Sequence, residues 1–314
     1  MTLRLSALSP QEYARCVLPL THGLWGNTLT LERYIERNAE IAHSAYGRRF
    51  YGTFALCDDR SQVLASFKRY ERTARAGQST LRAFGIGAVF TPPQYRGAGY
   101  ASAMLAMALD AGRAQGFDLA YLFSDIHPQF YKQLGFVELA SRTISLRADA
   151  LGATRVRAEP FGDRDWSAAR ACFSAMEAAR EDALARTAPD WNLLRLRQES
   201  GDNFLVRRGK QIAAYVLGRR EPKHDAYVLE ELAFASAPDQ ALIGPLLRSA
   251  AGDLRRVTGW LPPLPARAVL ARGAVRRRTS ALLMSVALSA AGGRFIEAAA
   301  RKSSGDFVWS ADHV

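Results

Sequence analysis

The amino-acid sequence predicts a two-domain α/β protein with a mixed sheet in each domain. Three observations carry this prediction. The chain has 314 residues, about twice the length of an average domain. Its hydrophobic fraction of 48% is high enough to build packed cores. Predicted strands and helices are mixed along it, and their order in the second half repeats their order in the first.

The first half is expected to form one sheet covered by helices. Its strands, rich in aromatic and β-branched residues, are predicted at 3–8, 50–56, 63–71, 81–90, 119–124 and 136–146. Its helices, with apolar residues at helical spacing, are predicted from a Ser9-Pro10 cap and at 30–45, 99–115 and 128–134. Strand 119–124 follows strand 81–90 through a helix, which predicts a parallel crossover. Segment 136–146 is expected to close this sheet.

The second half is expected to repeat this plan after a linker at 149–153, which gives domains at 1–150 and 151–314. Its strands are predicted at 156–161, 204–207, 211–217 and 227–235. Its helices are predicted at 163–180, 189–199 and 239–255. The repetition is in the order of elements and not in residue identity, so it predicts a tandem fold.

Composition excludes several functional classes. The net charge of +12 is spread along the chain without a dense basic stripe interleaved with aromatics, which argues against a nucleic-acid-binding surface. The three cysteines, Cys16, Cys57 and Cys172, form no CxxC pair, so neither a zinc ribbon nor a disulfide scaffold is expected, and no metal is predicted. The most apolar stretch, 281–291, is too short to span a membrane, and the N-terminal segment has no signal-peptide pattern. A cytoplasmic protein without a membrane partner is predicted.

The segment from Val89 to Ala101 carries the most chemical information. A strand ends there, a turn containing Gly97 and Gly99 follows, and a helix begins at once. The first backbone N–H groups of a helix lack intrahelical partners, and the helix dipole adds partial positive charge. Glycines let the backbone approach a ligand, and Arg96 adds a formal charge. The segment predicts a pyrophosphate site; the alternative is that the glycine pair only makes a tight turn.

Other phosphate and nucleophile motifs are missing from the sequence. Gly85 and Gly87 lie inside a predicted strand without a third glycine three positions on, so they are no dinucleotide fingerprint. Neither a P-loop nor a GxSxG nucleophile elbow occurs.

The string from Gln94 to Gly99, QYRGAG, matches the Q/R-x-x-G-x-G/A motif of the GCN5-related N-acetyltransferase (GNAT) superfamily. About 30 residues downstream, as in that superfamily, the segment from Tyr131 to Phe136 is similar to its Y-x-x-x-G-F helix. The resemblance covers roughly residues 4–147. Segments 90–93 and 124–126 also resemble the fungal lysine N6-acetyltransferases and their bacterial relatives.

The resemblance implies an enzyme that uses acetyl-CoA as donor and a primary amine as acceptor, with lysine or a lysine-like small molecule as the first acceptor to test. It implies that the pantetheine arm pairs with the backbone of Ala88, Val89 and Phe90, and that an N–H there stabilises the oxyanion. The other residues that it places at the cofactor are Gln94, Tyr95, Arg96, Gly97, Ala98, Gly99, Tyr100, Ala101, Ser102 and Ser124.

Acid and base roles follow from the same resemblance and from the chemistry of the reaction. Tyr131 occupies the general-acid position, where a phenol protonates the leaving thiolate; the alternative is a packing role. The attacking ammonium must lose a proton, and Glu71, Asp125 and His127 are the candidate bases. Asp125 is equally suited to cap the helix near Pro128. A water chain without a dedicated base is the remaining alternative.

The second half lacks the phosphate-loop string, because its equivalent segment 234–239 has no glycine pair and carries an acid, Asp239. We therefore predict a degenerate second domain that shapes the acceptor pocket. The aromatic-rich segment 307–314 is expected to dock, and Asp312 or the Val314 carboxylate to enter the first domain's active site; the alternative is a closing strand. Two other functions remain open: an acyl-CoA-binding regulator without catalysis, and a nucleic-acid-binding protein.

Overall fold

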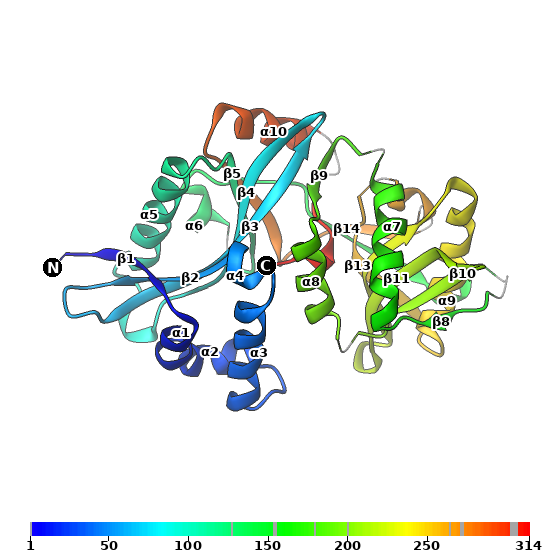
Figure 1. Cartoon of the computed structure of the whole chain (residues 1–314), viewed down its shortest axis with the longest axis horizontal. Coiled ribbons are helices and arrows are strands. Elements are labelled where there is room, and N and C mark those ends of the chain that lie inside the picture. Colours follow the sequence, from blue (N-terminus) through cyan, green and yellow to red (C-terminus); the bar gives the residue numbers. More distant parts are fainter. Residues whose placement is uncertain are drawn as a thin grey trace.

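The computed structural model describes residues 2–126, 128–152, 156–178, 180–199, 201–263, 265–270, 273–301 and 307–314. Two sheets with helices packed on them lie side by side along the long axis of the molecule (Figure 1). We call each sheet with its helices the first and the second unit. The C-terminus lies between the two units (Figure 1).

The first unit is built on an eight-stranded mixed sheet. Its strands are β1(Arg4–Leu8), β2(Tyr51–Cys57), β3(Val63–Ala76), β4(Ser79–Phe90), β5(Leu119–Ser124), β6(Val137–Glu138), β9(Asp182–Ala185) and β15(Leu282–Ala287). They run in the order β1-β2-β3-β4-β5-β15-β6, and β9 pairs with β3. The predicted parallel crossover is confirmed, since β4 and β5 pair in parallel and α5 connects them.

Helices cover both faces of the first sheet. They are α1(Pro10–Cys16), α2(Leu18–Trp25), α3(Leu31–His43), α4(Gly47–Phe50), α5(Tyr100–Ala114), α6(Gln129–Lys132) and α10(Ala290–Arg301). On one face α5 buries Met104 and Leu105 against Phe84 and Ile86 of β4. On the other face α1, α2 and α3 form a second core. Strand alternation therefore decides which β3 and β4 side chains meet α5 and which meet the α1–α3 layer.

The second unit repeats this plan. Its strands are β7(Arg142–Arg147), β8(Glu159–Pro160), β10(Phe204–Arg208), β11(Gln211–Glu221), β12(Ala226–Phe234), β13(Arg256–Trp260) and β14(Ala274–Arg277). They run in the order β14-β7-β13-β12-β11-β10-β8. Its α-helices are α7(Trp166–Glu177), α8(Ala188–Arg197) and α9(Ile243–Ala251). The parallel pair β12–β13 is joined through α9, as β4–β5 is joined through α5.

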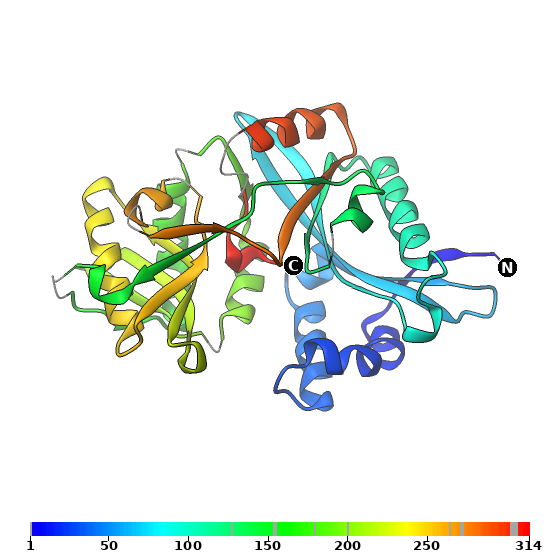
Figure 2. The same cartoon turned by 180° about the vertical axis from the view of Figure 1, so that it is seen from behind.

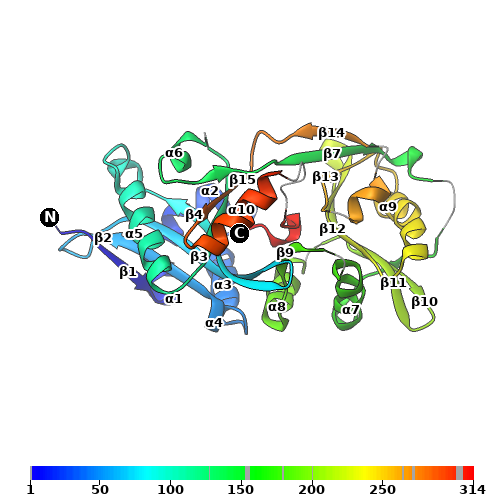
Figure 3. The ribbon, with the colours of Figure 1, turned by 90° about the horizontal axis from the view of Figure 1, so that it is seen from above.

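Strands cross between the two halves of the chain, which corrects the prediction for segment 136–146; β9 from the second half already lies on β3. Only β6 remains at the edge of the first sheet, whereas β7 pairs with β13 and β14 in the second. In return, β15 enters the first sheet between β5 and β6. The crossing chains are visible from behind and from above (Figures 2 and 3). The reason is burial, because Ile144 and Leu146 fill the second core, while Leu283 and Met284 fill the first. A cut at residue 150 would leave the first sheet without β9 and β15 and the second sheet without β7.

The C-terminal segment docks as predicted. Phe307, Val308 and Trp309 are buried, and a short 3₁₀ turn, η7(Ser310–Asp312), replaces the alternative of a closing strand. Within the described ranges, every helix is too short or too polar to cross a bilayer.

Candidate active site

The loop between β4 and α5 presents a row of backbone donors without partners. Gly97 and Gly99 have φ of +78° and +79°, and Gly99 is the N-cap of α5. Across this fully described stretch, no protein acceptor meets the N–H groups of residues 97–102; the first bonded amide is that of Ala103, which donates to the Gly99 carbonyl at 3.0 Å. Arg96 is exposed beside them, with Nε donating to the Thr91 carbonyl at 3.1 Å. Such a row at a helix N-terminus is suited to bind an anion.

β4 separates from β5 next to this loop. Their pairing ends at Ile86 and Leu122. Beyond it, β4 contains a bulge at Ala88, which has φ of +49°, and its register against β3 shifts between Gly87 and Phe90. The main chain of residues 88–90 therefore faces a gap between the strands instead of a β5 partner. Bulges of this kind redirect backbone groups beside active sites.

Tyr131 lies on α6, close to the end of β5. Its ring is 7% exposed and packs edge-on against Phe130 and Phe136, with centroids 4.9 Å and 5.9 Å away. Burial, together with the negative charge of Asp125, raises the pKa of Tyr131 to about 12. The hydroxyl therefore keeps its proton at neutral pH and is available as a donor.

The other residues predicted near Tyr131 have structural contacts. The Asp125 carboxylate accepts a hydrogen bond from the Ala281 amide at 2.9 Å, so it ties the end of β5 to the chain that enters β15. It does not cap α6, which has no side-chain cap. Ser124 is buried, and its Oγ donates to the Ile126 carbonyl at 2.8 Å. His127 lies outside the described residues.

Glu71 is not brought to the splayed end of β4. In the β3–β4 register it lies opposite Phe84, four residues before Ala88. That offset corresponds to roughly 13 Å along a strand. Its carboxylate pairs with Arg69 at 2.8 Å, and Arg69 also bonds Gln115 at the C-terminal end of α5. Glu71 therefore lies on the α5 face, far from the N-terminal end of that helix.

Val314 lies on the opposite face, against the two glycines of β4. A Cβ atom added to Gly87 would lie 2.8 Å from the Val314 carbonyl carbon, and one added to Gly85 would lie 2.9 Å from Cγ2 of Val314. Only glycine allows this approach. The sequence indicated such a close approach, because a glycine inside a strand often marks a site where another backbone segment packs closely. The C-terminal segment therefore reaches β4 one residue before the bulge, and its entry into an active site stays a prediction.

Asp312 holds the C-terminal segment between the units through buried ion pairs. Its carboxylate meets Arg186 at 2.7 Å and Arg72 at 3.7 Å. Arg72 in turn pairs with Asp190 at 2.5 Å, and Arg186 pairs with Glu231. Burial opposes ionisation of Asp312, but Arg186 and Arg72 outweigh it and keep its pKa below the usual value. Arg72 belongs to β3 and Arg186 to the segment after β9, so one carboxylate links the first sheet to the second unit.

His313 lies beside this network, between the two units. Its ring packs against Phe123 and Trp260, with centroids 4.7 Å and 5.5 Å away. Arg197, the last residue of α8, donates to the His313 carbonyl. His313 is an exposed residue, yet the protein packed around its ring, followed by the charge of Arg197, lowers its pKa to about 4. The imidazole is therefore neutral at neutral pH.

Lys68 is a buried lysine on the face of the first sheet against which Val314 lies. It is 9% exposed, and its Nζ donates to Asn38 Oδ1 at 2.5 Å. Burial, followed by the charge of Arg197, lowers the pKa of Lys68 to about 7. The folded protein therefore disfavours the ammonium form.

This burial predicts a pH-dependent effect of Lys68→Met. The unfolded chain binds more protons between pH about 7 and 10.5, so the wild-type protein gains stability as pH rises through that window. Methionine removes the buried charge, so we expect the variant to be about 2 kcal/mol more stable at pH 6. The gap should close toward pH 10. Thermal unfolding midpoints across this range test the prediction, and a pH-independent gap would contradict it.

The loop of the second unit that corresponds to residues 91–99 lacks an anion cradle. Asp239 lies there within η5(Ala237–Leu242), buried, and accepts a hydrogen bond from Ser236 Oγ at 2.5 Å. It also pairs with Arg208 at 2.6 Å. A carboxylate occupies the place where a phosphate would bind, as the sequence predicted for a degenerate second unit.

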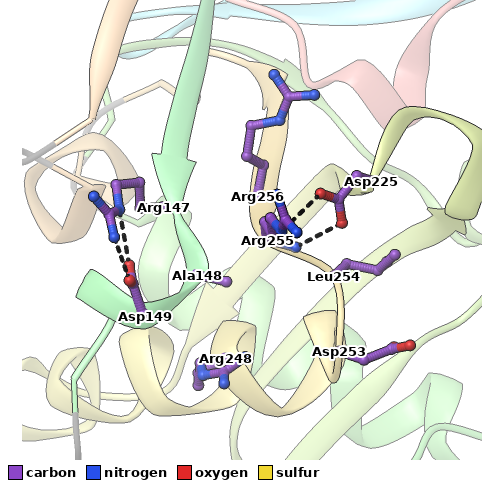
Figure 4. A pocket seen from close by; sticks show the side chains of 9 residues that line it. All are labelled: Arg147, Ala148, Asp149, Asp225, Arg248, Asp253, Leu254, Arg255 and Arg256. Atoms are coloured by element: carbon purple, nitrogen blue, oxygen red, sulfur yellow. Dashed lines mark hydrogen bonds and ion pairs between the residues drawn. The ribbon is translucent and has the colours of Figure 1, made fainter.

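The second unit also has a cavity of about 640 Å³ lined largely by arginines and aspartates. Figure 4 shows Arg147 bonded to Asp149 and Arg255 paired with Asp225. Of the other charged side chains that line the cavity, Arg248 and Arg256 donate to the main-chain carbonyls of Gly252 and His224. Among the described residues, no cluster of three or more His, Cys, Asp or Glu side chains is arranged to hold a metal ion.

Comparisons with known proteins agree with this geometry. Residues 26–138 match the family model described as an acetyltransferase (GNAT) domain. A comparison with curated proteins finds no significant match.

Several solved structures share the fold over most of the chain. A probable N-acyltransferase from Enterococcus faecalis has a TM-score of 0.72 at 16% identity, covering 95% of this chain and 74% of that one. A GCN5-related N-acetyltransferase from Kribbella flavida has a TM-score of 0.67 at 20% identity, covering 93% and 73%. A tandem GNAT protein from the clavulanic acid biosynthesis pathway has a TM-score of 0.52 at 12% identity, covering 92% and 99%. Residues 26–138 therefore match a GNAT acetyltransferase domain, and the chain as a whole shares the fold of these structures, the tandem GNAT protein among them.

Proposed function

We propose that this protein transfers the acetyl group of acetyl-CoA to the primary amine of a small molecule, at the splayed end of β4. The observation that carries the proposal is the row of unpartnered N–H groups at residues 97–102. A dianionic pyrophosphate is the ligand that such a row, with Arg96 beside it, fits best. The bound thioester would supply an electrophilic carbonyl carbon and a thiolate leaving group.

We assign to the main chain of β4 the binding of the pantetheine arm. Residues 88–90 have no β5 partner, so their N–H and C=O groups are available to pair with the amide groups of an extended pantetheine arm. We assign to a main-chain N–H at the Ala88 bulge the stabilisation of the oxyanion that forms during attack.

Tyr131 belongs to the core on the α5 face of the first sheet, and Val314 lies on the opposite face against Gly87. We assign Tyr131 the role of general acid, because its hydroxyl keeps its proton at neutral pH and a phenol suits a thiolate leaving group. The Val314 carbonyl oxygen lies over Gly87, one residue before the bulge, and would orient the attacking amine by accepting its hydrogen bond. Asp125, beside Tyr131, is the better placed of the described carboxylate candidates for the base, since Glu71 is held on the α5 face.

Calorimetric titration with acetyl-CoA tests the proposal. We expect one site per chain, because Asp239 occupies the corresponding loop of the second unit. Arg96→Ala should weaken binding about tenfold, the loss of one charge-assisted contact. Arg113→Ala is the matched control, since Arg113 is an exposed arginine at the opposite end of α5 and pairs with Asp110.

Failure has two distinct forms. Absence of acetyl-CoA binding would exclude the proposed function. Tight binding without turnover over a panel of amines would instead favour a regulatory acyl-CoA-binding protein.

A further inference from the structure

Lys68 is a buried lysine, and none of the described acids pairs with its ammonium form. Its ammonium bonds the Asn38 amide oxygen, and across the described ranges no carboxylate lies within ion-pair distance of it. A buried charge is costly unless it is paired. The positive charge of Arg197 repels the ammonium form of Lys68 and lowers its pKa further. An anionic ligand would supply the missing partner.

The position of Lys68 connects it to the reaction site. In the sheet it lies directly between Thr53 of β2 and Gly87 of β4. Thr53 lines a cavity of about 340 Å³ between the α1–α3 layer and the sheet. Gly87 is the residue on which Val314 lies, next to the bulge at Ala88. Lys68 therefore lies between a cavity and the splayed end of β4.

Hydroxyl groups surround the same point. Tyr13 lines the cavity, its ring centroid is 5.6 Å from Lys68 Nζ, and its hydroxyl is buried without a hydrogen-bond partner among the described residues. The hydroxyls of Tyr34 and Tyr70 interact electrostatically with that of Tyr13. The rest of the lining combines apolar side chains such as Leu18 and Ile35 with His43 and the exposed Arg48. Lys68 lies behind this lining, where its Nζ contacts the lining residues Asn38 and Tyr13, and the cavity has room for a hydrocarbon chain.

We propose that the acceptor is an amino-acid-like amine whose carboxylate binds Lys68 and the Tyr13 hydroxyl, while its amino group reaches the splayed end of β4. This inference rests on the proposed acetyl transfer. A single cation without an acid partner matches a singly charged carboxylate. Arg197 is already held by the His313 carbonyl and the Tyr70 ring, so a dianion would lack a second partner. Lys68 and the splayed end of β4 are separated by one or two strand spacings of about 4.8 Å. An acceptor with its amino and carboxylate groups at opposite ends of a hydrocarbon chain spans this distance.

Two amines that differ only in a carboxylate test this proposal. The pair is 6-aminohexanoate and pentylamine, and calorimetry measures the affinity of each for the protein saturated with CoA. We expect the wild-type protein to prefer 6-aminohexanoate by roughly 10- to 100-fold, the range for a hydrogen bond to a charged group. In Lys68→Met the preference should disappear. In Tyr13→Phe, which removes only an unpartnered hydroxyl, it should fall severalfold. Lys210→Met, at the exposed β10–β11 turn, is the control and should keep the full preference.

Each outcome decides between explanations. Equal affinity of both amines for the wild-type protein, or a preference that survives in Lys68→Met, overturns the carboxylate site. An equal fall of kcat with both amines in Lys68→Met also overturns it and assigns Lys68 to proton transfer. A Lys68-dependent preference in binding without any acetyl transfer supports the carboxylate site and rejects the proposed function. Acetyl transfer to both amines without a preference supports the proposed function and rejects the carboxylate site.

Discussion

Replacement of Tyr131 by phenylalanine is expected to lower kcat about 10²-fold while leaving the affinity for acetyl-CoA close to the wild-type value. The ring contacts with Phe130 and Phe136 survive in the variant, so the change removes only the hydroxyl. Loss of a general acid raises the barrier for departure of the thiolate and does not touch the loop at residues 97–102. Steady-state kinetics, together with calorimetry, separate these two effects.

The pH dependence gives a second readout of the same role. With a pKa of about 12, Tyr131 stays protonated through the usual assay range, so the kcat profile of the wild-type protein should lack a descending limb up to pH 10. Tyr227→Phe is the matched control, because it removes a hydroxyl that bonds only the Asp202 carbonyl in the second unit. If Tyr131→Phe keeps kcat within a factor of about three, the residue serves packing alone.

The glycine turn before α5 could be predicted from the sequence because its geometry is local. The turn that contains Gly97 and Gly99 and the helix that follows determine where the N–H groups point, and all of this lies within one short segment. The parallel crossover through α5 was predictable for the same reason. Side-chain periodicity gives the type of an element and the face that it buries.

The strand exchange could not be predicted in this way. Alternation in β7 and β15 shows that Ile144 and Leu283 are buried, but it does not show against which sheet. Long-range contacts raised the same difficulty at the site. Arg186 and Asp312 are 126 positions apart, and the sequence around neither residue predicts that the two form an ion pair. Glu71 was a reasonable candidate by its place near a strand end, yet its face of β3 directs it to Arg69.

Asp312→Asn is expected to lower the stability of the protein by about 3 kcal/mol, because it breaks two buried ion pairs and leaves Arg72 with Asp190 and Arg186 with Glu231. Arg72 and Arg186 are both almost fully buried, with side chains 3% and 1% exposed, so solvent cannot replace the carboxylate. Asp149→Asn, which breaks an exposed pair with Arg147, is the control and should cost less than about 1 kcal/mol. Thermal unfolding of both variants at pH 7 measures the difference, and equal effects would contradict the prediction.

The same variant should also lose activity at temperatures where it is still folded. Asp312 positions the two residues that follow it, and Val314 lies on Gly87 at the proposed reaction site. Deletion of residues 313–314 separates the two roles, because it keeps the ion pairs of Asp312 and removes the contact with Gly87. We expect this deletion to leave the unfolding midpoint nearly unchanged and to lower kcat/KM at least tenfold, a loss typical of misplaced substrate. Full activity of the deletion with a small amine would mean that the segment only joins the units. Loss of activity without loss of stability would mean that the second unit, through Arg186, sets the geometry of the first unit's active site.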